Sequence, residues 1–245
     1  MKPSEIINIA NRESYALDYA NIVASGGGLS RWVYDKSHRD IERGVQSDET
    51  PEAVILEVGA QADQHRKWVV QKHSRYIVSD IELAPLLSAK EKYQKELHLQ
   101  IPEDTNISEV KFEEINAESI PYAEKTFDRL IATCLIAHLD SPVDALHEWR
   151  RVMKNNGLIT FYVPCEPGFM LRIARRMTHK RAKRTSKYSY DLLEYSQHKN
   201  HFPAIHEFTK FVFEADLITR RLFPFNFLPW DFNLWAVYKI RVRKV

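Results

Sequence analysis

The chain has 245 residues, of which 44% are hydrophobic and 28% are charged. This length and composition suit one large α/β domain with its own core and an additional segment, and they exclude a repeat or low-complexity protein. The formal net charge of +2 is close to neutral, so the overall charge gives no reason to expect nucleic-acid binding.

Cysteine usage and hydropathy bear on the compartment. The chain has two cysteines, Cys134 and Cys165, and we expect both to be free thiols in a reducing environment. The first residues lack the charged and then apolar pattern of a signal peptide, and no stretch approaches the roughly 20 apolar residues of a membrane span. These features predict a cytoplasmic protein.

Helical patterning dominates the first part of the chain. Residues 1–50 are predicted to form an N-terminal helical segment, interrupted at Gly26-Gly27-Gly28. After the glycines, Leu29 to Arg43 is predicted to be a second amphipathic helix. We expect the main domain to occupy residues 51–245.

Short apolar runs alternate with helical stretches from residue 53 onward. Five strands are predicted, at Ala53–Val58, Tyr76–Ser79, Val110–Ile115, Phe127–Thr133 and Leu158–Val163. Helices are predicted between them, at His65–Lys72, Ala84–Leu97 and Pro142–Lys154. This alternation is typical of βαβ units in a parallel sheet, with the ligand site at the carboxyl ends of the strands.

The last third of the chain departs from this alternation. Leu222–Phe227 and Leu234–Arg243 are predicted to be two late strands that form an antiparallel hairpin at the sheet edge. Residues 166–205 are predicted to be an inserted segment on the acceptor side. The predicted fold is therefore an α/β, Rossmann-like, doubly wound and mostly parallel sheet with a late antiparallel edge hairpin and helical N-terminal and cap segments.

Polar residues and a glycine follow three of the predicted strands. Gly59 follows the first strand directly, and a glycine there lets the backbone pass close to a ligand. Asp80 ends the second strand, where a carboxylate can accept hydrogen bonds from both hydroxyls of a ribose. Asn116 and Ala117 end the third strand, where a side-chain oxygen and a backbone N–H can contact adenine. One nucleoside could contact all three strand ends, although each residue taken singly is equally typical of a turn or a helix cap.

The stretch from Ala53 to Pro164 resembles the S-adenosylmethionine (SAM)-dependent methyltransferases of the Rossmann-like (class I) type 11 group. The resemblance is carried by Val54-Ile-Leu-Glu-Val-Gly-Ala60, Tyr76–Ile81, Asn116-Ala-Glu-Ser-Ile-Pro-Tyr122 with Phe127-Asp128, and Leu135-Ile-Ala-His-Leu-Asp-Ser-Pro142 with Ala145–Gly157. It implies SAM as the cofactor. It also implies cofactor contacts from Glu57, Gly59, Ala60, Asp63, Asp80, Ile81, Asn116, Ala117, Cys134 and Leu135.

The glycine loop differs from the pattern of that family. Three alternating glycines are usual there, whereas this chain has Gly59 followed by Gln61 and Asp63 at the other two places. Non-glycine residues restrict the backbone of the loop, and Asp63 could compensate by binding the ammonium group of the cofactor. A catalytically inactive SAM-fold binding protein is therefore an alternative. An NAD(P) dehydrogenase is disfavoured because the chain lacks G-x-G-x-x-G after the first strand.

Three histidines are candidate catalytic bases for a hydroxyl acceptor. His138 follows the fourth predicted strand and matches the histidine of the family at that point, and His198 and His201 lie in the inserted segment. His138 could equally pack against its helix. His198 and His201 resemble a metal-binding pair, but no third ligand accompanies them at a suitable spacing, so we predict no metal.

The inserted segment carries a run of eight basic residues without an intervening acid. These are Arg172, Arg175, Arg176, Lys180, Arg181, Lys183, Arg184 and Lys187. Such a run attracts anions, although charge runs are more often solvated faces. We take Arg175, Arg176, Lys183 and Arg184 as acceptor-binding candidates.

The predicted function is O-methylation of a small or lipid-linked anionic acceptor, in glycan or natural-product biosynthesis, with an anionic membrane surface as a further partner. An RNA methyltransferase is the alternative, and nucleic acid is disfavoured because no Asn-Pro-Pro-Tyr-type amine site appears. The aromatic stretch Leu222–Trp230 could cover an apolar acceptor, contact a bilayer or pack internally. The sequence leaves the oligomeric state open.

Overall fold

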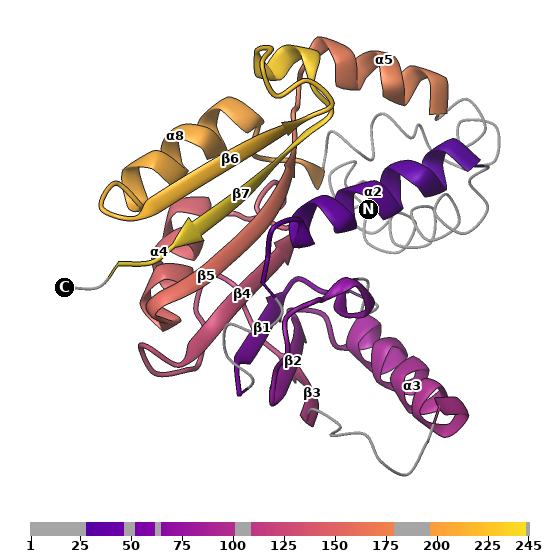
Figure 1. Cartoon of the computed structure of the whole chain (residues 1–245), viewed down its shortest axis with the longest axis vertical. Coiled ribbons are helices and arrows are strands. Elements are labelled where there is room, and N and C mark those ends of the chain that lie inside the picture. Colours follow the sequence, from indigo (N-terminus) through magenta and orange to yellow (C-terminus); the bar gives the residue numbers. More distant parts are fainter. Residues whose placement is uncertain (1–27, 47–51, 62–64, 101–108, 179–196, 244–245) are drawn as a thin grey trace, which may run out of the picture.

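The structure, a computed structural model, describes residues 28–46, 52–61, 65–100, 109–178 and 197–243. A seven-stranded sheet with the strand order β3-β2-β1-β4-β5-β7-β6 forms its centre (Figure 1). The first five strands in this order run parallel, and β7 and β6 complete the sheet as an antiparallel pair. The predicted sheet with its edge hairpin is confirmed. The predicted helical segment before residue 28 lies outside the described residues.

The inner parallel strands β1 and β4 are short, mostly apolar and buried runs, as expected for strands that are covered on both faces, whereas the edge strand β3 is largely charged and only half-buried. The parallel strands are β1 (Val54–Val58), β2 (Arg75–Asp80), β3 (Glu109–Glu114), β4 (Phe127–Thr133) and β5 (Met153–Pro164). The antiparallel strands are β6 (Leu217–Phe223) and β7 (Trp235–Arg241). The order reverses between β1 and β4, and this reversal places the carboxyl ends of β1, β2 and β4 around one crevice position.

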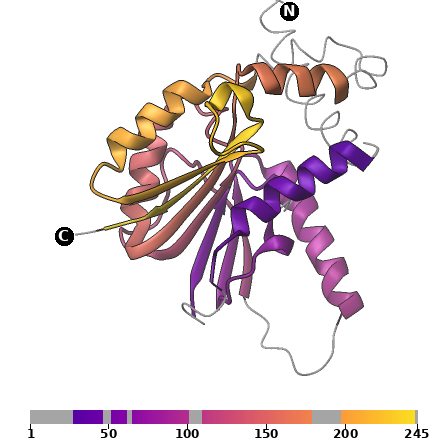
Figure 2. The same ribbon diagram turned by 45° about the horizontal axis from the view of Figure 1, so that its top comes forward.

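Helices cover both faces of the sheet (Figure 2). On one side lie α2 (Gly28–Glu42) and α3 (Leu83–Gln100), and on the other lie α4 (Pro142–Val152) and α8 (Phe202–Val212). Helix α5 (Phe169–Thr178) follows β5 and lies beyond the carboxyl ends of the strands. Among the described residues there are also two short 3₁₀ turns, η1 (Arg66–Trp68) and η2 (Trp230–Phe232).

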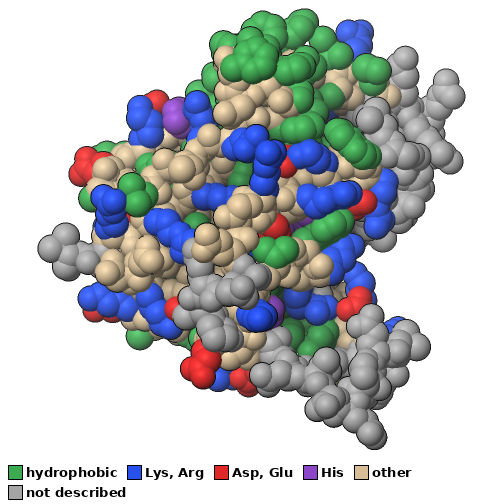
Figure 3. All heavy atoms as spheres, in the orientation of Figure 1, with side chains coloured by type: hydrophobic (Ala, Val, Ile, Leu, Met, Phe, Trp, Pro, Cys, Tyr) green, Lys and Arg blue, Asp and Glu red, His purple; other side chains and the backbone are tan. Residues whose placement is uncertain are grey.

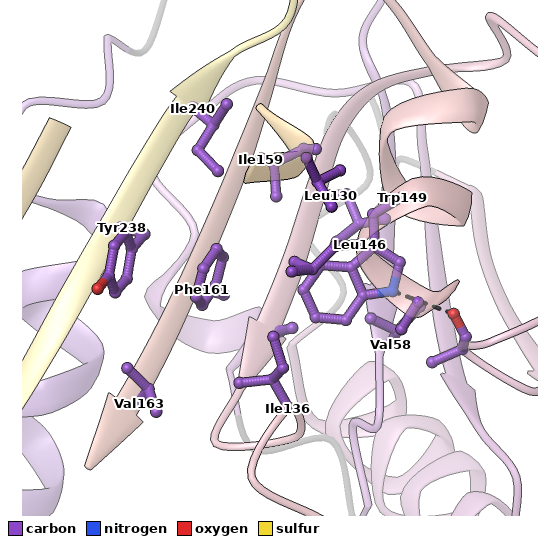
Figure 4. Close-up of a cluster of buried hydrophobic side chains, with 14 of the residues drawn as sticks. Val58, Leu130, Ile136, Leu146, Trp149, Ile159, Phe161, Val163, Tyr238 and Ile240 are labelled. Atoms are coloured by element: carbon purple, nitrogen blue, oxygen red, sulfur yellow. Dashed lines mark hydrogen bonds between the residues drawn. The ribbon is translucent and has the colours of Figure 1, made fainter. Parts of the chain in front are cut away.

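The larger core lies between the sheet and the helices α4 and α8 (Figure 4). Trp149 of α4 is fully buried, and its indole Nε1–H donates a hydrogen bond of 3.1 Å to the carbonyl oxygen of Ala117. Phe161 of β5 stacks on Tyr238 of β7 with ring centroids 4.7 Å apart, which joins the parallel and antiparallel parts of the sheet. The core therefore positions the segment after β3 directly against α4.

Two predicted elements were wrong. His65–Lys72 is not an α-helix, because the carboxylate of Glu42 accepts hydrogen bonds from both His65 Nε2 and the Val70 backbone N–H and holds this segment against α2. The predicted strand Leu222–Phe227 lies at Leu217–Phe223 instead. The second half of the predicted strand, residues 225–227, lies in a turn instead. The buried Asn233 side chain holds this turn, because it donates a hydrogen bond to the Phe225 carbonyl oxygen and accepts one from the Phe225 backbone N–H.

One predicted strand has a different start. We expected β5 to begin at Leu158, but the strand begins at Met153 and contains Asn156-Gly157. Asn156 has a φ of 62°, and the pairing register with β4 shifts between Phe127 and Arg129. The Asn-Gly pair therefore forms an irregularity inside the strand, as bulges do, and does not precede it.

No helix in the described part of the chain has both the length and the apolar character needed to cross a bilayer.

Candidate functional site

The loop after β1 turns sharply at Gly59, which has a φ of +64°. A Cβ at this position would lie 2.6 Å from a methyl carbon of the Leu135 side chain. Glycine is favoured here because of the positive φ, and a Cβ would in addition require the Leu135 side chain, from the loop after β4, to shift. Ala60 follows, is buried, and donates its N–H to the Ser79 carbonyl oxygen at 2.9 Å.

Asp80 lies at the end of β2, beside this loop. Its Oδ2 accepts a hydrogen bond of 2.8 Å from the Gln61 backbone N–H, and its Oδ1 accepts one of 3.0 Å from the Glu82 backbone N–H. Each carboxylate oxygen has more than one acceptor direction, so two ribose hydroxyls can still donate to it. The arrangement fits the predicted nucleoside contact, and it adds a second role, which is to hold the glycine loop against β2.

The remaining predicted cofactor residues are in different situations. Ile81 is 60% exposed beside Asp80, and Ala117 is buried. The side-chain oxygen of Asn116 already accepts the Glu118 backbone N–H at 2.9 Å, so a contact with adenine would have to share that oxygen. Glu57 is fully buried and accepts a 2.6 Å hydrogen bond from the Tyr76 hydroxyl, which makes a direct contact with the cofactor unfavourable. Asp63 lies outside the described residues.

A buried charged network anchors α2 beneath the glycine loop. Arg129 of β4 is fully buried and donates to both carboxylate oxygens of Glu42, at 2.6 and 3.0 Å. Glu42 also accepts a 2.8 Å hydrogen bond from His65 Nε2, and His65 Nδ1 lies 2.8 Å from Nδ1 of His38. Because His65 directly follows residues 62–64, this network fixes the end of the loop that begins at Gly59. Sequence reasoning did not identify it.

A second polar cluster lies at the carboxyl end of β4. Cys134, His138 and His198 each place one potential ligand atom within 4.8 Å of the others. The His138 and His198 rings meet edge to face, with centroids 4.6 Å apart. Two of the three predicted catalytic histidines are therefore brought together, with Cys134 beside them. His201 is exposed at the N-cap position of α8 and lies outside this cluster.

Glu166, which follows β5, completes the cluster and was not predicted from the sequence. It is buried, accepts a short hydrogen bond from Nδ1 of His198, and pairs with Arg175 of α5 through a 2.7 Å contact to Nη1. The loop Cys165-Glu166-Pro167-Gly168 had no signal that separated this carboxylate from a solvent-exposed one.

Burial and neighbouring charges set the protonation of these groups. Burial lowers the pKa of His138 to about 3, helped by the nearby His198, so His138 is neutral. Burial opposes the charge on His198, but the Cys134 and Glu166 side chains outweigh it and raise the pKa of His198 to about 9. Burial likewise opposes the charge on Glu166, but the hydrogen bonds from His198 and Arg175 hold the pKa of Glu166 at about 2. The cluster thus pairs the protonated imidazole of His198 with the ionised carboxylate of Glu166.

The second cysteine has no comparable role. Cys165 is fully buried, and burial raises its pKa to about 12, so it remains a neutral thiol. A buried neutral thiol of this kind packs as a small apolar side chain.

Two of the four acceptor-binding candidates, Arg175 and Arg176, lie among the described residues. Arg175 is committed to Glu166, whereas Arg176 is exposed on α5. Lys183 and Arg184 lie outside the described residues.

The hollows on the surface of the described residues include two that lie away from the strand ends. One, of about 160 Å³, is lined by α2 and the β6–β7 hairpin, including Lys36, Asp40 and Phe223. The other is an open depression near Glu124 and Arg243. Neither includes Gly59, Asp80 or the cluster at Cys134, so the geometry at the strand ends, and not a hollow, identifies the candidate site.

Comparisons with known proteins agree with this geometry. Residues 56–161 match the family model described as a methyltransferase domain. No curated protein matches the chain in sequence.

Solved structures share the fold. YcgJ from Bacillus subtilis is 14% identical, with 86% of this chain and 100% of that chain aligned and a TM-score of 0.59. A SAM-dependent methyltransferase from Thermotoga maritima, described as a possible histamine N-methyltransferase, is 13% identical over 96% of this chain and 98% of its own, with a TM-score of 0.59. The CurJ carbon methyltransferase is 14% identical over 86% of this chain and 55% of its own, also with a TM-score of 0.59. Residues 56–161 therefore form a methyltransferase domain, on a fold that this chain shares with solved SAM-dependent methyltransferases.

Proposed function

We propose that this methyltransferase modifies an oxygen atom of a lipid-linked or small anionic acceptor, and that the acceptor approaches from the side of α5. The single observation that carries the proposal is the surface of α5, which combines exposed apolar and exposed basic side chains beside the strand ends. The cofactor supplies an electrophilic methyl group. The protein aligns the acceptor with this group and takes up the proton that the acceptor releases.

The surface of α5 has two adjacent stripes. Phe169, Ile173 and Met177 recur every four residues and are 51%, 40% and 64% exposed. Arg172 and Arg176, also four residues apart, are exposed beside them. A basic face next to an apolar face on one helix is typical of helices that bind anionic lipids.

The apolar surface continues from α5 onto the neighbouring 3₁₀ turn. The rings of Phe169 and Phe232 lie 6.3 Å apart, and Phe232 is 43% exposed. Figure 3 shows hydrophobic side chains gathered over η2 and the start of α5, with Lys and Arg side chains nearby. Phe227, in the turn before η2, is 85% exposed. A continuous apolar surface next to cationic side chains favours an acceptor with an apolar part and an anionic part.

The polar cluster at the end of β4 favours oxygen as the acceptor atom. In the transfer, the acceptor oxygen forms the new bond to the methyl carbon while the sulfur–methyl bond breaks and its electron pair stays on sulfur. A hydroxyl must also lose its proton, and imidazole is the side chain best suited to accept it. Of the two adjacent rings at the strand end, His138 is the neutral one and offers that acceptor, with His198 beside it.

The test follows the labelled methyl group and the location of the enzyme. The full chain is incubated with methyl-labelled SAM and either anionic vesicles of phosphatidylglycerol or zwitterionic vesicles of phosphatidylcholine, each loaded with a lipid extract. We expect co-sedimentation with the anionic vesicles and base-labile or ether-linked label in the lipid phase. A labelled product confined to the aqueous phase, with no vesicle binding, would contradict the lipid-linked acceptor.

A matched pair of variants isolates the role of α5. The double variant Arg172→Glu, Arg176→Glu should weaken vesicle binding at least about ten-fold, since each basic residue near an anionic surface contributes about 1 kcal/mol. SAM affinity should not change, because both residues lie away from β1 and β2. The control Lys90→Glu, Lys92→Glu makes the same charge change on exposed positions of α3. Equal losses in both variants would show that only overall charge matters.

A further inference from the structure

We propose that Cys134, His138 and His198 bind a thiophilic divalent metal ion of the Zn²⁺ class at the carboxyl end of β4. Thiolate and imidazole are the ligands that this class of ion prefers, and three protein ligands with an open fourth position are typical of catalytic zinc sites. The spacing Cys-x-x-x-His joins two of the ligands along the chain. The third ligand comes from a segment sixty residues later and reaches the site only in the folded structure.

The donor atoms have a spacing that such an ion can bridge. All three potential ligand atoms lie within 4.8 Å of one another. Donor atoms around a tetrahedral Zn²⁺ are about 3–4 Å apart, given bond lengths of about 2.0–2.3 Å, so small side-chain rotations would close the site. His138 and Cys134 are partly buried and His198 is buried, which limits competition from water.

The hydrogen bonding of His198 provides independent support. Its Nδ1 is bonded to the buried carboxylate of Glu166, while its buried Nε2 has no nitrogen or oxygen partner among the described residues and is left for the Cys134 thiol side of the cluster. An imidazole held by a carboxylate on one nitrogen and open on the other is the usual arrangement of a metal-binding histidine. Arg175 pairs with the same carboxylate and fixes its position.

Hydrogen bonds to the backbone hold the segments that carry the three ligands in place without an ion. Asn200 donates from its side chain to the carbonyl oxygens of Ile136, at 3.2 Å, and Leu139, at 2.7 Å, which ties the segment of His198 to the loop of His138. The Cys134 backbone N–H donates to the carbonyl oxygen of Tyr162 at 3.2 Å. Cys134 also has a φ of 61°, a conformation that is unfavourable for a residue with a Cβ and that is often retained at functional sites.

A bound ion would also change how the acceptor loses its proton, a consequence that rests on the proposed function. With both imidazoles acting as ligands, neither could accept the proton. A hydroxyl at the open fourth position would instead release its proton to water, because a bound divalent ion lowers the pKa of an oxygen ligand. Metal binding itself does not depend on which acceptor is used.

Cobalt provides a direct spectroscopic test on the full chain. The protein is treated with a chelator, freed of it, and titrated with Co²⁺, and zinc is measured by elemental analysis after reconstitution. We expect one equivalent of Co²⁺, with visible d–d bands of tetrahedral coordination and a thiolate-to-cobalt charge-transfer band. Absence of stoichiometric binding, or cobalt bands without the thiolate band, would overturn the site.

Matched variants identify the ligands. Cys134→Ser should abolish the charge-transfer band and weaken binding by about 100-fold or more, and Glu166→Gln should weaken it by about 10–100-fold. The controls are Cys165→Ser for the thiol and His147→Gln, exposed on α4, for an imidazole. Both controls should leave the spectrum unchanged. If Cys134→Ser keeps the wild-type spectrum while its circular dichroism shows an intact fold, Cys134 is not a ligand and the proposal fails. These spectra require neither SAM nor an acceptor, so their outcome is separate from that of the vesicle experiment.

Discussion

Asp80 connects the cofactor prediction to the local backbone. A change to Ala would release the Gln61 and Glu82 backbone N–H groups as well as any ribose contact, so Asp80→Asn is the sharper test. We expect Asp80→Asn to weaken SAM binding by about 1.5–3 kcal/mol, because hydrogen bonds to a charged group are lost or weakened. Calorimetric titration measures the effect, and Asp144→Asn, exposed on α4, serves as the control. Equal SAM affinity in Asp80→Asn and wild type would remove Asp80 from the cofactor site.

Gln61 stands where the family usually has a glycine, and its φ of 47° shows why glycine is favoured there. A residue with a Cβ in this conformation costs about 1–2 kcal/mol. We therefore expect Gln61→Gly to raise the free energy of unfolding by up to about 1 kcal/mol. The gain is smaller than the backbone cost because glycine also increases the conformational entropy of the unfolded chain. SAM affinity should change little, because the Gln61 backbone N–H holds Asp80 in either variant.

Urea denaturation checks the stability change in Gln61→Gly. Lys125→Gly, at a φ of 58° and distant from the site, is the matched control and should show a similar gain. A marked loss of SAM affinity in Gln61→Gly would mean that the side chain has acquired a cofactor contact.

At the scale of elements, α2 is held to the sheet by an ion pair that is closed to solvent. Arg129→Met would leave the Glu42 carboxylate buried without its guanidinium partner, and we expect a loss of about 3–5 kcal/mol in the free energy of unfolding. Adding Glu42→Leu should restore part of this loss, since no uncompensated charge then remains. Chemical denaturation of both variants measures the coupling. If the losses of the two single variants, Arg129→Met and Glu42→Leu, simply add in the double variant, the two side chains are not coupled and the assigned pairing is contradicted.

At the scale of the whole molecule, the same network predicts sensitivity to acid. His65 donates from Nε2 to Glu42, so its Nδ1 accepts from His38 and both rings are neutral. Burial, with the neighbouring His65, lowers the pKa of His38 from 6.5 to about 3. The unfolded chain therefore binds a proton below pH 6.5 that the folded chain does not bind, and the folded state loses stability as the pH falls from 6.5 toward 3.

We expect the free energy of unfolding to fall by about 2–3 kcal/mol between pH 6.5 and about pH 4.5 for His38 alone. Thermal denaturation across this range measures the slope, and His38→Phe, which keeps an aromatic ring beside Tyr34 and Trp68, should flatten it. An equal slope in wild type and His38→Phe would show that His38 titrates normally in the folded protein.

The sequence alone predicted the sheet and its edge hairpin, and the residues at the strand ends indicated the class of cofactor. The inner strands β1 and β4 are short apolar runs whose local pattern is independent of their partners, and the residues that follow β1 and β2 are characteristic of nucleoside binding. Local patterns could not predict Glu166, whose partners His198 and Arg175 approach from separate segments.

The tertiary structure alone decided which distant residues meet. No spacing rule joins Cys134 and His138 to His198, or Glu42 to Arg129, because such contacts depend on the strand order and on which loops converge at one end of the sheet. The turn at Phe225 likewise depends on the buried Asn233 side chain, and the 3₁₀ turn at Arg66–Trp68 on the Glu42 carboxylate. Side-chain hydrogen bonds to the backbone replaced the strand and the helix expected there, because a buried polar group must be satisfied wherever the folded chain places it.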